Sequence, residues 1–262
     1  LIMVSSVLAP VQQRGREALQ RLGLPTRRQE AWRLTDLKRL EAVQALPPIS
    51  ADSGNDWPQQ PQSGLRLLLG TDQHPLQGVE LPIGIKALHR DELEILLGRA
   101  TDHCGCSKDW AVELNKSCSR ELLALQISGK APPLELVIAA SGSGLLATRV
   151  LLILDPNAEL ELLQVFQADD GAAQSHLCEI LLGEESHLQH GLVSLGDGTS
   201  SLLTTLATQQ KPRSHYAFSS FVQGSILARI EPRIVQLQGQ AFTSLKGLAV
   251  AAEEQQIGVH SA

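Results

Sequence analysis

The chain has 262 residues, of which 43% are hydrophobic and 19% charged, and 22 Lys and Arg against 28 Asp and Glu give a formal net charge of −6. This composition excludes disorder and collagen-like repeats, and the length allows one large domain or two small ones. Residues 1–50 carry 8 basic and 4 acidic side chains, whereas residues 122–210 carry 2 and 10. A general nucleic-acid binder needs an excess of basic side chains, so nucleic acid is not expected as a partner.

The cysteine content and the hydropathy indicate the compartment. The chain has four cysteines, which are too few and too clustered for a disulfide framework, so a reducing compartment is expected. No run of 18 apolar residues occurs, and residues 1–10 lack the basic start of a signal peptide. We therefore expect a soluble, cytoplasmic protein with no membrane partner.

Residues 1–46 predict an N-terminal helical region. Pro10 suits the first position of one helix, and Gly23 suits the position just after its end. Thr26 begins a capping-box pattern that predicts a second helix, which Pro47 would stop.

The next two parts differ in composition. Residues 47–64 are rich in Pro, Gly, Ser and Gln, and such a segment predicts a linker. Residues 65–121 predict a mixed α/β region, with a strand over 65–69 and helices over 90–98 and 108–116.

Residues 122–262 contain short apolar runs separated by turn residues, which predict strands. Four segments superpose with Ala158, Ser186, Ser214 and Ala241 at equivalent positions, separated by 28, 28 and 27 residues. Each repeat has room for two strands, as one coil of a flattened parallel β-helix would. A β-sandwich is the alternative fold, but it gives no reason for equal spacing.

Strand alternation assigns the side chains of each repeat to an inner or an outer face. Two residues after the superposed positions, Leu160, Leu188 and Tyr216 are predicted to form an interior column. The β-helix is therefore expected to have an aliphatic core that is continuous from coil to coil.

Three segments occur in an order that resembles the SufB/SufD family of iron-sulfur cluster assembly proteins. They are LPTRRQEAWRLTDLKRL (24–40), ELNKS (113–117) and RVLLILDPNAELELLQVF (149–166). The positions closest to the SufD pattern are Glu30, Trp32, Arg33, Thr35, Asp36 and Leu37. The resemblance implies a mainly β fold with some α-helix, in which an N-terminal helical region is followed by a right-handed parallel β-helix (solenoid) and then by a C-terminal helical segment.

The resemblance also implies a function. It identifies a non-catalytic SufD-like subunit of the SufBCD scaffold complex, which assembles an iron-sulfur cluster with energy from the SufC ATPase. The implied partners are a SufB-like paralogue and a SufC-like ATPase. The family's C-terminal segment, which binds the ATPase and holds the proposed Cys and His site, lies beyond Ala262. We therefore expect no cofactor bound stably by this chain, a cluster only at the level of the complex, and a homodimer through an uncovered last coil.

Two groups of residues are candidates for a metal site. His103, Cys104, Cys106 and Cys118 offer tetrahedral zinc ligands, but C-x-C is tighter than the common C-x-x-C spacing, so unpaired thiols are expected. The outward positions Glu159, His187 and His215 should form one column, which we interpret as polar side chains facing the solvent rather than as a metal site. His190 lies two residues after Leu188 and therefore faces the interior as well. It is expected to be a buried, hydrogen-bonded histidine.

Enzyme functions find little support in the sequence. There is no phosphate-binding loop, and the stretch SGSG at 141–144 reads as a turn rather than a phosphate cradle. Ser141 and Ser143 lack the strand-turn-helix setting of a nucleophile elbow. A β-helix polysaccharide lyase or hydrolase needs basic groups beside its carboxylates, but residues 122–210 hold only Lys130 and Arg149. We expect no catalytic residues; the alternatives are an extracellular-type β-helix polysaccharide lyase or hydrolase and a β-helix interaction module with another partner.

Overall fold

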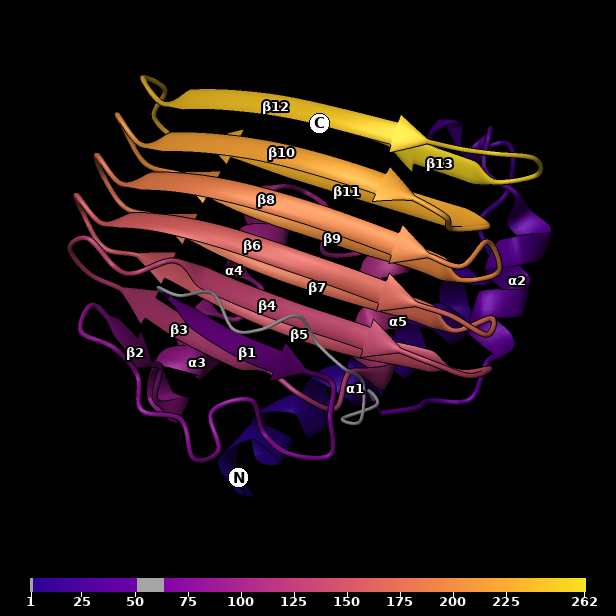
Figure 1. Ribbon diagram of the computed structural model, residues 1–262, viewed down its shortest axis with the longest axis horizontal. Helices are drawn as coiled ribbons and strands as arrows, with labels where there is room; N and C mark the ends of the chain where they lie inside the picture. Colours follow the sequence, from indigo (N-terminus) through magenta and orange to yellow (C-terminus); the bar gives the residue numbers. More distant parts are fainter. Residues whose placement is uncertain (1, 51–63) are drawn as a thin grey trace.

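The structure is a computed structural model that describes residues 2–50 and 64–262. Helices predominate in the first half of the chain and strands in the second (Figure 1). The helical elements are α1 (Ile2–Leu22), the 3₁₀ turn η1 (Glu30–Trp32), α2 (Leu37–Ala45), α3 (Arg90–Leu96), α4 (Arg99–His103) and α5 (Trp110–Cys118). No helix among the described residues is both long and apolar enough to cross a membrane.

The strands are arranged in two stacked sheets. Their bounds are β1 (Leu65–Leu69), β2 (Ile85–Ala87), β3 (Leu123–Ile127), β4 (Leu134–Ala140), β5 (Leu145–Leu154), β6 (Glu159–Ala168), β7 (Ala173–Leu182), β8 (His187–Gly196), β9 (Ser201–Gln210), β10 (His215–Gln223), β11 (Leu227–Gln236), β12 (Phe242–Val250) and β13 (Gln256–Val259). One sheet has the order β1-β4-β6-β8-β10-β12 and the other the order β13-β11-β9-β7-β5-β3-β2. Among the described strands only β2 and β3 pair antiparallel. From β3 onward successive strands alternate between the two sheets, so the predicted parallel β-helix is confirmed (Figure 1).

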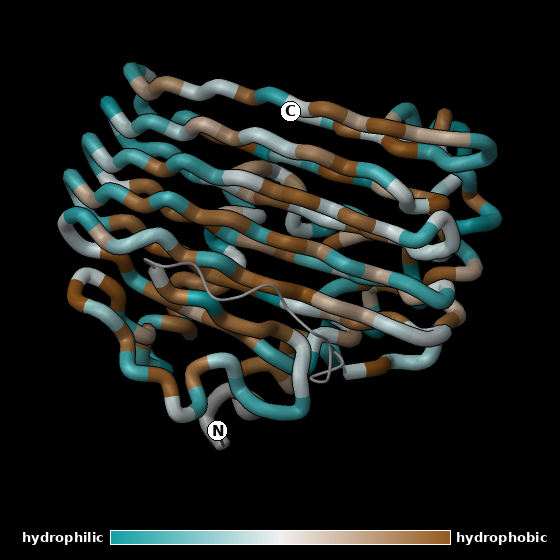
Figure 2. Tube along the Cα trace, viewed as in Figure 1, coloured by the Kyte–Doolittle hydropathy of each residue, from teal (hydrophilic) through white to brown (hydrophobic). Residues whose placement is uncertain are grey.

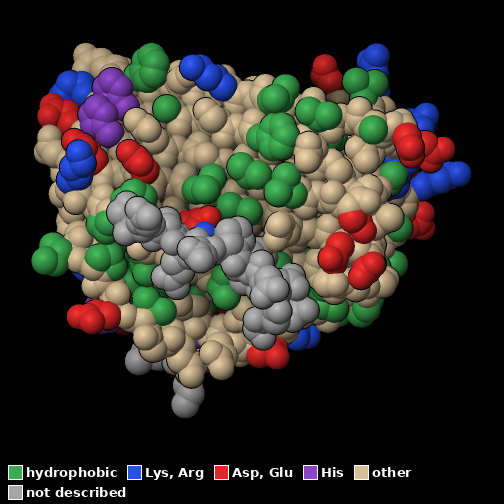
Figure 3. Space-filling model, in the orientation of Figure 1, with side chains coloured by type: hydrophobic (Ala, Val, Ile, Leu, Met, Phe, Trp, Pro, Cys, Tyr) green, Lys and Arg blue, Asp and Glu red, His purple; other side chains and the backbone are tan. Residues whose placement is uncertain are grey.

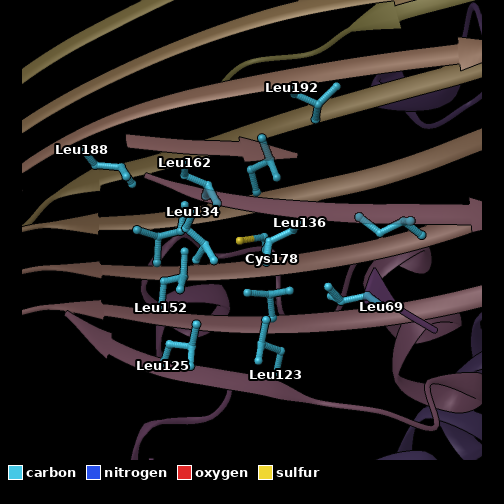
Figure 4. Close-up of a cluster of buried hydrophobic side chains, with 14 of the residues drawn as sticks. Leu69, Leu123, Leu125, Leu134, Leu136, Leu152, Leu162, Cys178, Leu188 and Leu192 are labelled. Atoms are coloured by element: carbon cyan, nitrogen blue, oxygen red, sulfur yellow. The ribbon is translucent and has the colours of Figure 1, made fainter. Parts of the chain in front are cut away.

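The pairing register is the one that the repeat predicts. Leu160 pairs with Leu188, Leu188 with Tyr216, and Tyr216 with Thr243. The first three side chains are 3%, 1% and 0% exposed and belong to the main core cluster, so the predicted interior column is confirmed. Figure 4 shows the same stacking of leucines from neighbouring coils in this cluster.

The turns of the β-helix repeat with the same spacing. Asn157, Glu185, Arg213 and Gln240 have φ values of 61°, 58°, 59° and 58°, the left-handed conformation that non-glycine residues rarely adopt. The first three donate their backbone N–H to a carbonyl in the turn of the next coil, at 2.9, 3.1 and 3.1 Å. The stacked turns therefore offset the conformational cost at each of these positions.

The two sheets differ in what covers their outer faces. The helices α4 and α5 pack on β7 and β9, and α5 also packs on β5, so these central strands of the seven-stranded sheet are buried on both faces. The outer face of the six-stranded sheet is open, and β6 and β8 alternate between exposed and buried residues. Figure 2 shows this alternation as teal and brown segments along the strands nearest the viewer.

The first helix begins earlier than the sequence predicts. Pro10 lies inside α1 rather than at its first position. Leu8 and Val11, on either side of Pro10, are buried, and a Cβ at Gly15 would lie 2.7 Å from the backbone nitrogen of Ser117. This close packing of α1 against α5 stabilises the helix enough to outweigh the hydrogen bond that proline removes.

The second helix begins later than predicted. The backbone N–H of Thr26 does donate to Oε1 of Gln29, at 2.8 Å, but only the short turn η1 follows. The helix α2 begins at Leu37, where Asp36 Oδ1 accepts hydrogen bonds from the two backbone N–H groups of Lys38 and Arg39. The aspartate cap therefore determines the start of this helix.

The segment between α2 and β1 is only partly described. Of the predicted linker over 47–64, residues 51–63 lie outside the described residues. The backbone N–H of Ile49 donates to the carbonyl of Leu145, and this hydrogen bond joins the segment to the first residue of β5. The strand predicted over 65–69 is present as β1 and extends the six-stranded sheet by pairing with β4. The helices predicted over 90–98 and 108–116 correspond to α3 and α5.

Candidate functional site

Cys104 and Cys106 lie in one buried apolar cluster, whereas Cys118 lies apart from them at the end of α5. Cys104 Sγ donates to the carbonyls of Thr208 (3.6 Å) and Arg233 (3.2 Å), whereas Cys118 Sγ donates to the carbonyl of Leu114 (3.0 Å). Burial raises the pKa of the Cys104 and Cys118 thiols to about 11 and that of Cys106 to about 12. Zinc binds the thiolate, so these environments disfavour the ligand form of the side chain.

No metal-binding arrangement is found in the described part of the chain. Groups of three or more His, Cys, Asp or Glu side chains placed to hold an ion are absent there. His103 of the cluster instead has its Nδ1 beside Oε1 of Gln209. That these residues bind no zinc remains a prediction, which metal analysis can test.

The outward column of polar side chains is where the register places it. Glu159 pairs with His187, and His187 with His215. The two imidazole rings stack at 4.4 Å between centroids with 6° between their planes, and Lys130 Nζ lies 3.7 Å from Glu159 Oε2. The column is therefore a stack of exposed rings that begins with an ion pair.

The inward histidine belongs to a buried hydrogen-bonded chain. As predicted, His190 is buried; its Nδ1 lies 3.0 Å from the Tyr216 hydroxyl and its Nε2 2.9 Å from Gln164 Oε1. Gln164 Nε2 lies 2.9 Å from Nε2 of His176, whose Nδ1 lies 2.8 Å from the Thr148 hydroxyl. Five side chains from both sheets thus cross the interior of the β-helix.

The two imidazoles of this hydrogen-bonded network, His176 and His190, are neutral. Burial lowers the pKa of His176 and of His190 to about 3, and burial also raises the pKa of the Tyr216 hydroxyl. A neutral ring has one N–H donor and one acceptor, which suits a chain of hydrogen bonds without net charge. The network can therefore fix the register of facing strands, because any slip would leave buried polar atoms without partners.

Sequence reasoning did not find His176. Its strand β7 is buried over its whole length, so no polar-apolar alternation marks which of its residues face inward. The repeat spacing offers the missing signal, because His176 pairs with Thr148 in the preceding coil and with Thr204 in the next. Extending the register to the second strand of each coil would have placed it in a polar interior column.

The N-terminal motif contacts the last coils of the β-helix. The guanidinium of Arg229 lies 4.0 Å from the ring centroid of Trp32, and its Nη1 donates to Thr35 Oγ1 at 3.1 Å. Arg39 Nη1 donates to the carbonyls of Ile226 (2.8 Å) and Glu254 (2.7 Å). The motif that carries the family resemblance therefore connects the helical region to β11 and to the loop before β13.

The last coil has an exposed surface. Most residues of β12 are exposed, including Phe242 at 53%, Leu248 at 59% and Val250 at 46%. Among the strands that the structure describes, β12 pairs in the six-stranded sheet with β10 alone, so its other edge presents backbone groups that are free for pairing with a further strand. Figure 3 shows hydrophobic side chains in the upper part of this face, where β10 and β12 lie in Figure 1. Phe242, Leu248 and Val250 lie on the outer face of this edge strand, and we call the strand with these side chains the β12 edge.

Comparisons with known proteins agree with this architecture. Residues 137–262, from within β4 to the end of the chain, match the core domain of SufBD proteins of the SUF system for iron-sulfur cluster assembly. The chain is 24% identical over 287 aligned residues to the iron-sulfur cluster assembly SufBD family protein slr0076 of Synechocystis sp. (strain ATCC 27184 / PCC 6803 / Kazusa). The alignment covers 98% of this chain and 62% of that relative.

The fold and the matched residues together define the class of protein. It is a parallel β-helix protein whose coils coincide with the SufBD core domain. Over residues 137–262 the chain is similar to the SufB/SufD family, and nearly its whole length aligns with part of a SufBD family protein.

Proposed function

We propose that this chain is a SufD-like, non-catalytic subunit of a cytoplasmic SufBCD scaffold complex that assembles iron-sulfur clusters. The observation that carries the proposal is the match between residues 137–262 and the SufBD core domain, because these residues form the stacked coils. In this role the chain binds and orients partner proteins. The iron-sulfur cluster is cargo of the assembled complex rather than a resident cofactor of this chain.

The β12 edge supports a scaffolding role. A strand with an open edge and exposed apolar side chains is suited to pairing with a further strand. A SufB-like paralogue would have coils of the same spacing, and its strands could extend the two sheets of this chain. The SufC-like ATPase would then act on the pair of β-helices rather than on this chain alone.

Affinity purification from the native host tests the proposal. The tagged protein should recover a SufB-like paralogue and a SufC-like ATPase. The variant L248E/V250E places two charges on the β12 edge and should reduce recovery of the paralogue at least fivefold. The control I83E changes a residue that is 97% exposed between β1 and β2, and it should recover both partners at the wild-type level. Recovery of neither partner with the unmodified protein would contradict the proposed function.

A further inference from the structure

A cavity lies on the helical side of the molecule, away from the β12 edge. Its volume is about 580 Å³, and α1, α4, α5 and β5 contribute to its walls. The lining contains five Lys or Arg side chains against three Asp or Glu. A volume of this size is typical of sites for small organic molecules and is much larger than a single ion needs.

Arg149 of β5 lies at the inner end of the cavity. Its side chain is 1% exposed, and its Nη2 donates to Glu179 Oε1 at 2.9 Å. Glu179 also accepts a hydrogen bond from the backbone N–H of Gly98, at 3.1 Å. The Nε and Nη1 groups of Arg149 are buried and have no hydrogen-bond partner within the described residues. A buried N–H without an acceptor costs free energy, so these two donors point to an anionic group that belongs beside them.

Other cations lie around the same cavity. Lys116 Nζ is already bound to Glu113, at 3.2 Å, and is therefore neutralised. Arg14 and Arg21 of α1 and Lys108 also line the cavity, and they form no salt bridge with the acidic side chains that the structure describes. The wall thus offers positive charge in addition to the two donors of Arg149.

The remaining lining is mixed, because Glu17, Thr101, Asp102 and Ser107 add polar groups to an apolar part. Val11, Ala18 and Leu22 of α1, together with Leu97, face the cavity. Apolar walls with a few convergent polar groups are typical of sites for organic ligands. A ligand that satisfies both parts has an anionic end and an apolar or aromatic body.

We propose that this cavity binds a small organic phosphate, whose phosphate group accepts hydrogen bonds from Arg149 and from the cations of α1. A phosphate has several acceptor oxygens and up to two negative charges, so it can serve donors that approach from β5 and from α1 together. The apolar residues contact the organic part. The site is separate from the proposed partner-binding edge and does not depend on the scaffold function.

Isothermal titration calorimetry of the purified chain at low salt tests the proposal. The probes are AMP, inorganic phosphate and adenosine, which separate the contribution of the phosphate from that of the organic body. We expect AMP to bind at least tenfold more tightly than either of the other two. Absence of binding by AMP at millimolar concentration, or binding of AMP no tighter than of adenosine or of inorganic phosphate, would overturn the proposal.

Substitutions of residues that line the cavity test whether AMP binds there. R14Q/R21Q removes two exposed cations and should weaken AMP binding at least fivefold, whereas the control R16Q changes an arginine of the same helix that does not line the cavity. Replacing Arg149 alone would leave Glu179 buried without its partner, so R149M/E179M removes the pair together and should abolish binding. If R149M/E179M fails to fold, the α1 variants still decide the outcome. AMP binding that both R14Q/R21Q and R16Q leave unchanged would overturn the assignment.

Discussion

Acid should destabilise this protein through the two histidines inside the β-helix. His176 and His190 are each 2% exposed, and burial lowers the pKa of each imidazole from 6.5 to about 3. The folded protein therefore keeps both rings neutral, whereas the unfolded chain binds protons as the pH falls below 6.5. This contribution to stability is fully present above pH 6.5 and is lost progressively as the pH falls towards 3.

The size of the effect follows from the shift. At pH 5, protonation favours the unfolded chain by about 2 kcal/mol for each imidazole, or about 4 kcal/mol for the pair. Glu121 acts in the opposite direction, because burial raises the pKa of its carboxyl from 4.5 to about 7. The folded state takes up that proton first, so this carboxyl adds stability as the pH falls from 7 towards 4.5. A comparison of variants is therefore needed to isolate the histidines.

Urea unfolding followed by circular dichroism at pH 7.5 and pH 5.0 measures the difference. In H176Q/H190Q, the decrease in the free energy of unfolding between these two pH values should be about 4 kcal/mol smaller than in the wild type. Each single variant should show about half of this change. The control H187Q/H215Q alters exposed rings and should keep the wild-type decrease. Equal decreases in the wild type and in H176Q/H190Q would refute the reasoning.

Four further predictions concern the core, the N-terminal motif, the cysteines and catalysis. Truncating Leu188 to Ala should lower the free energy of unfolding by about 2–5 kcal/mol, since a stacked interior position cannot collapse; a loss well below 1 kcal/mol in urea unfolding would contradict the interior column. Replacing Arg229 and its buried ion-pair partner Glu231 together by Met removes the contacts of Arg229 with Thr35 and with the ring beneath it, and should increase hydrogen exchange in α2; unchanged exchange would show that these contacts do not hold the helix. Elemental analysis should find less than one zinc per chain, and a stoichiometric zinc that is lost in C104S/C106S would reverse this interpretation. The purified chain should not hydrolyse ATP, and ATPase activity that follows the protein through successive columns would contradict a non-catalytic role.

The repeat made most of the β-helix predictable from sequence. Each coil places equivalent residues at equivalent turns, so the spacing of Ala158, Ser186 and Ser214 determines which strands are neighbours. The outer column and the buried His190 followed from the same alternation. The six-stranded sheet is open on one face, and its alternating pattern is therefore visible in the sequence.

The parts that could not be predicted depend on contacts between distant segments. The start of α1 depends on packing against α5, and Pro10 alone predicts a different boundary. The helices also cover the outer face of β7, so this strand is buried throughout and its sequence does not show that His176 faces inward. For the same reason the sequence predicted neither the burial of Arg149 nor its pairing with Glu179.

Native mass spectrometry of the purified chain mixed with the SufB-like paralogue and the SufC-like ATPase of the same organism tests the central claim most directly. The scaffold proposal predicts an assembly that contains all three proteins. A spectrum in which this chain remains alone, or associates only with itself while the other two proteins combine without it, would contradict the proposal.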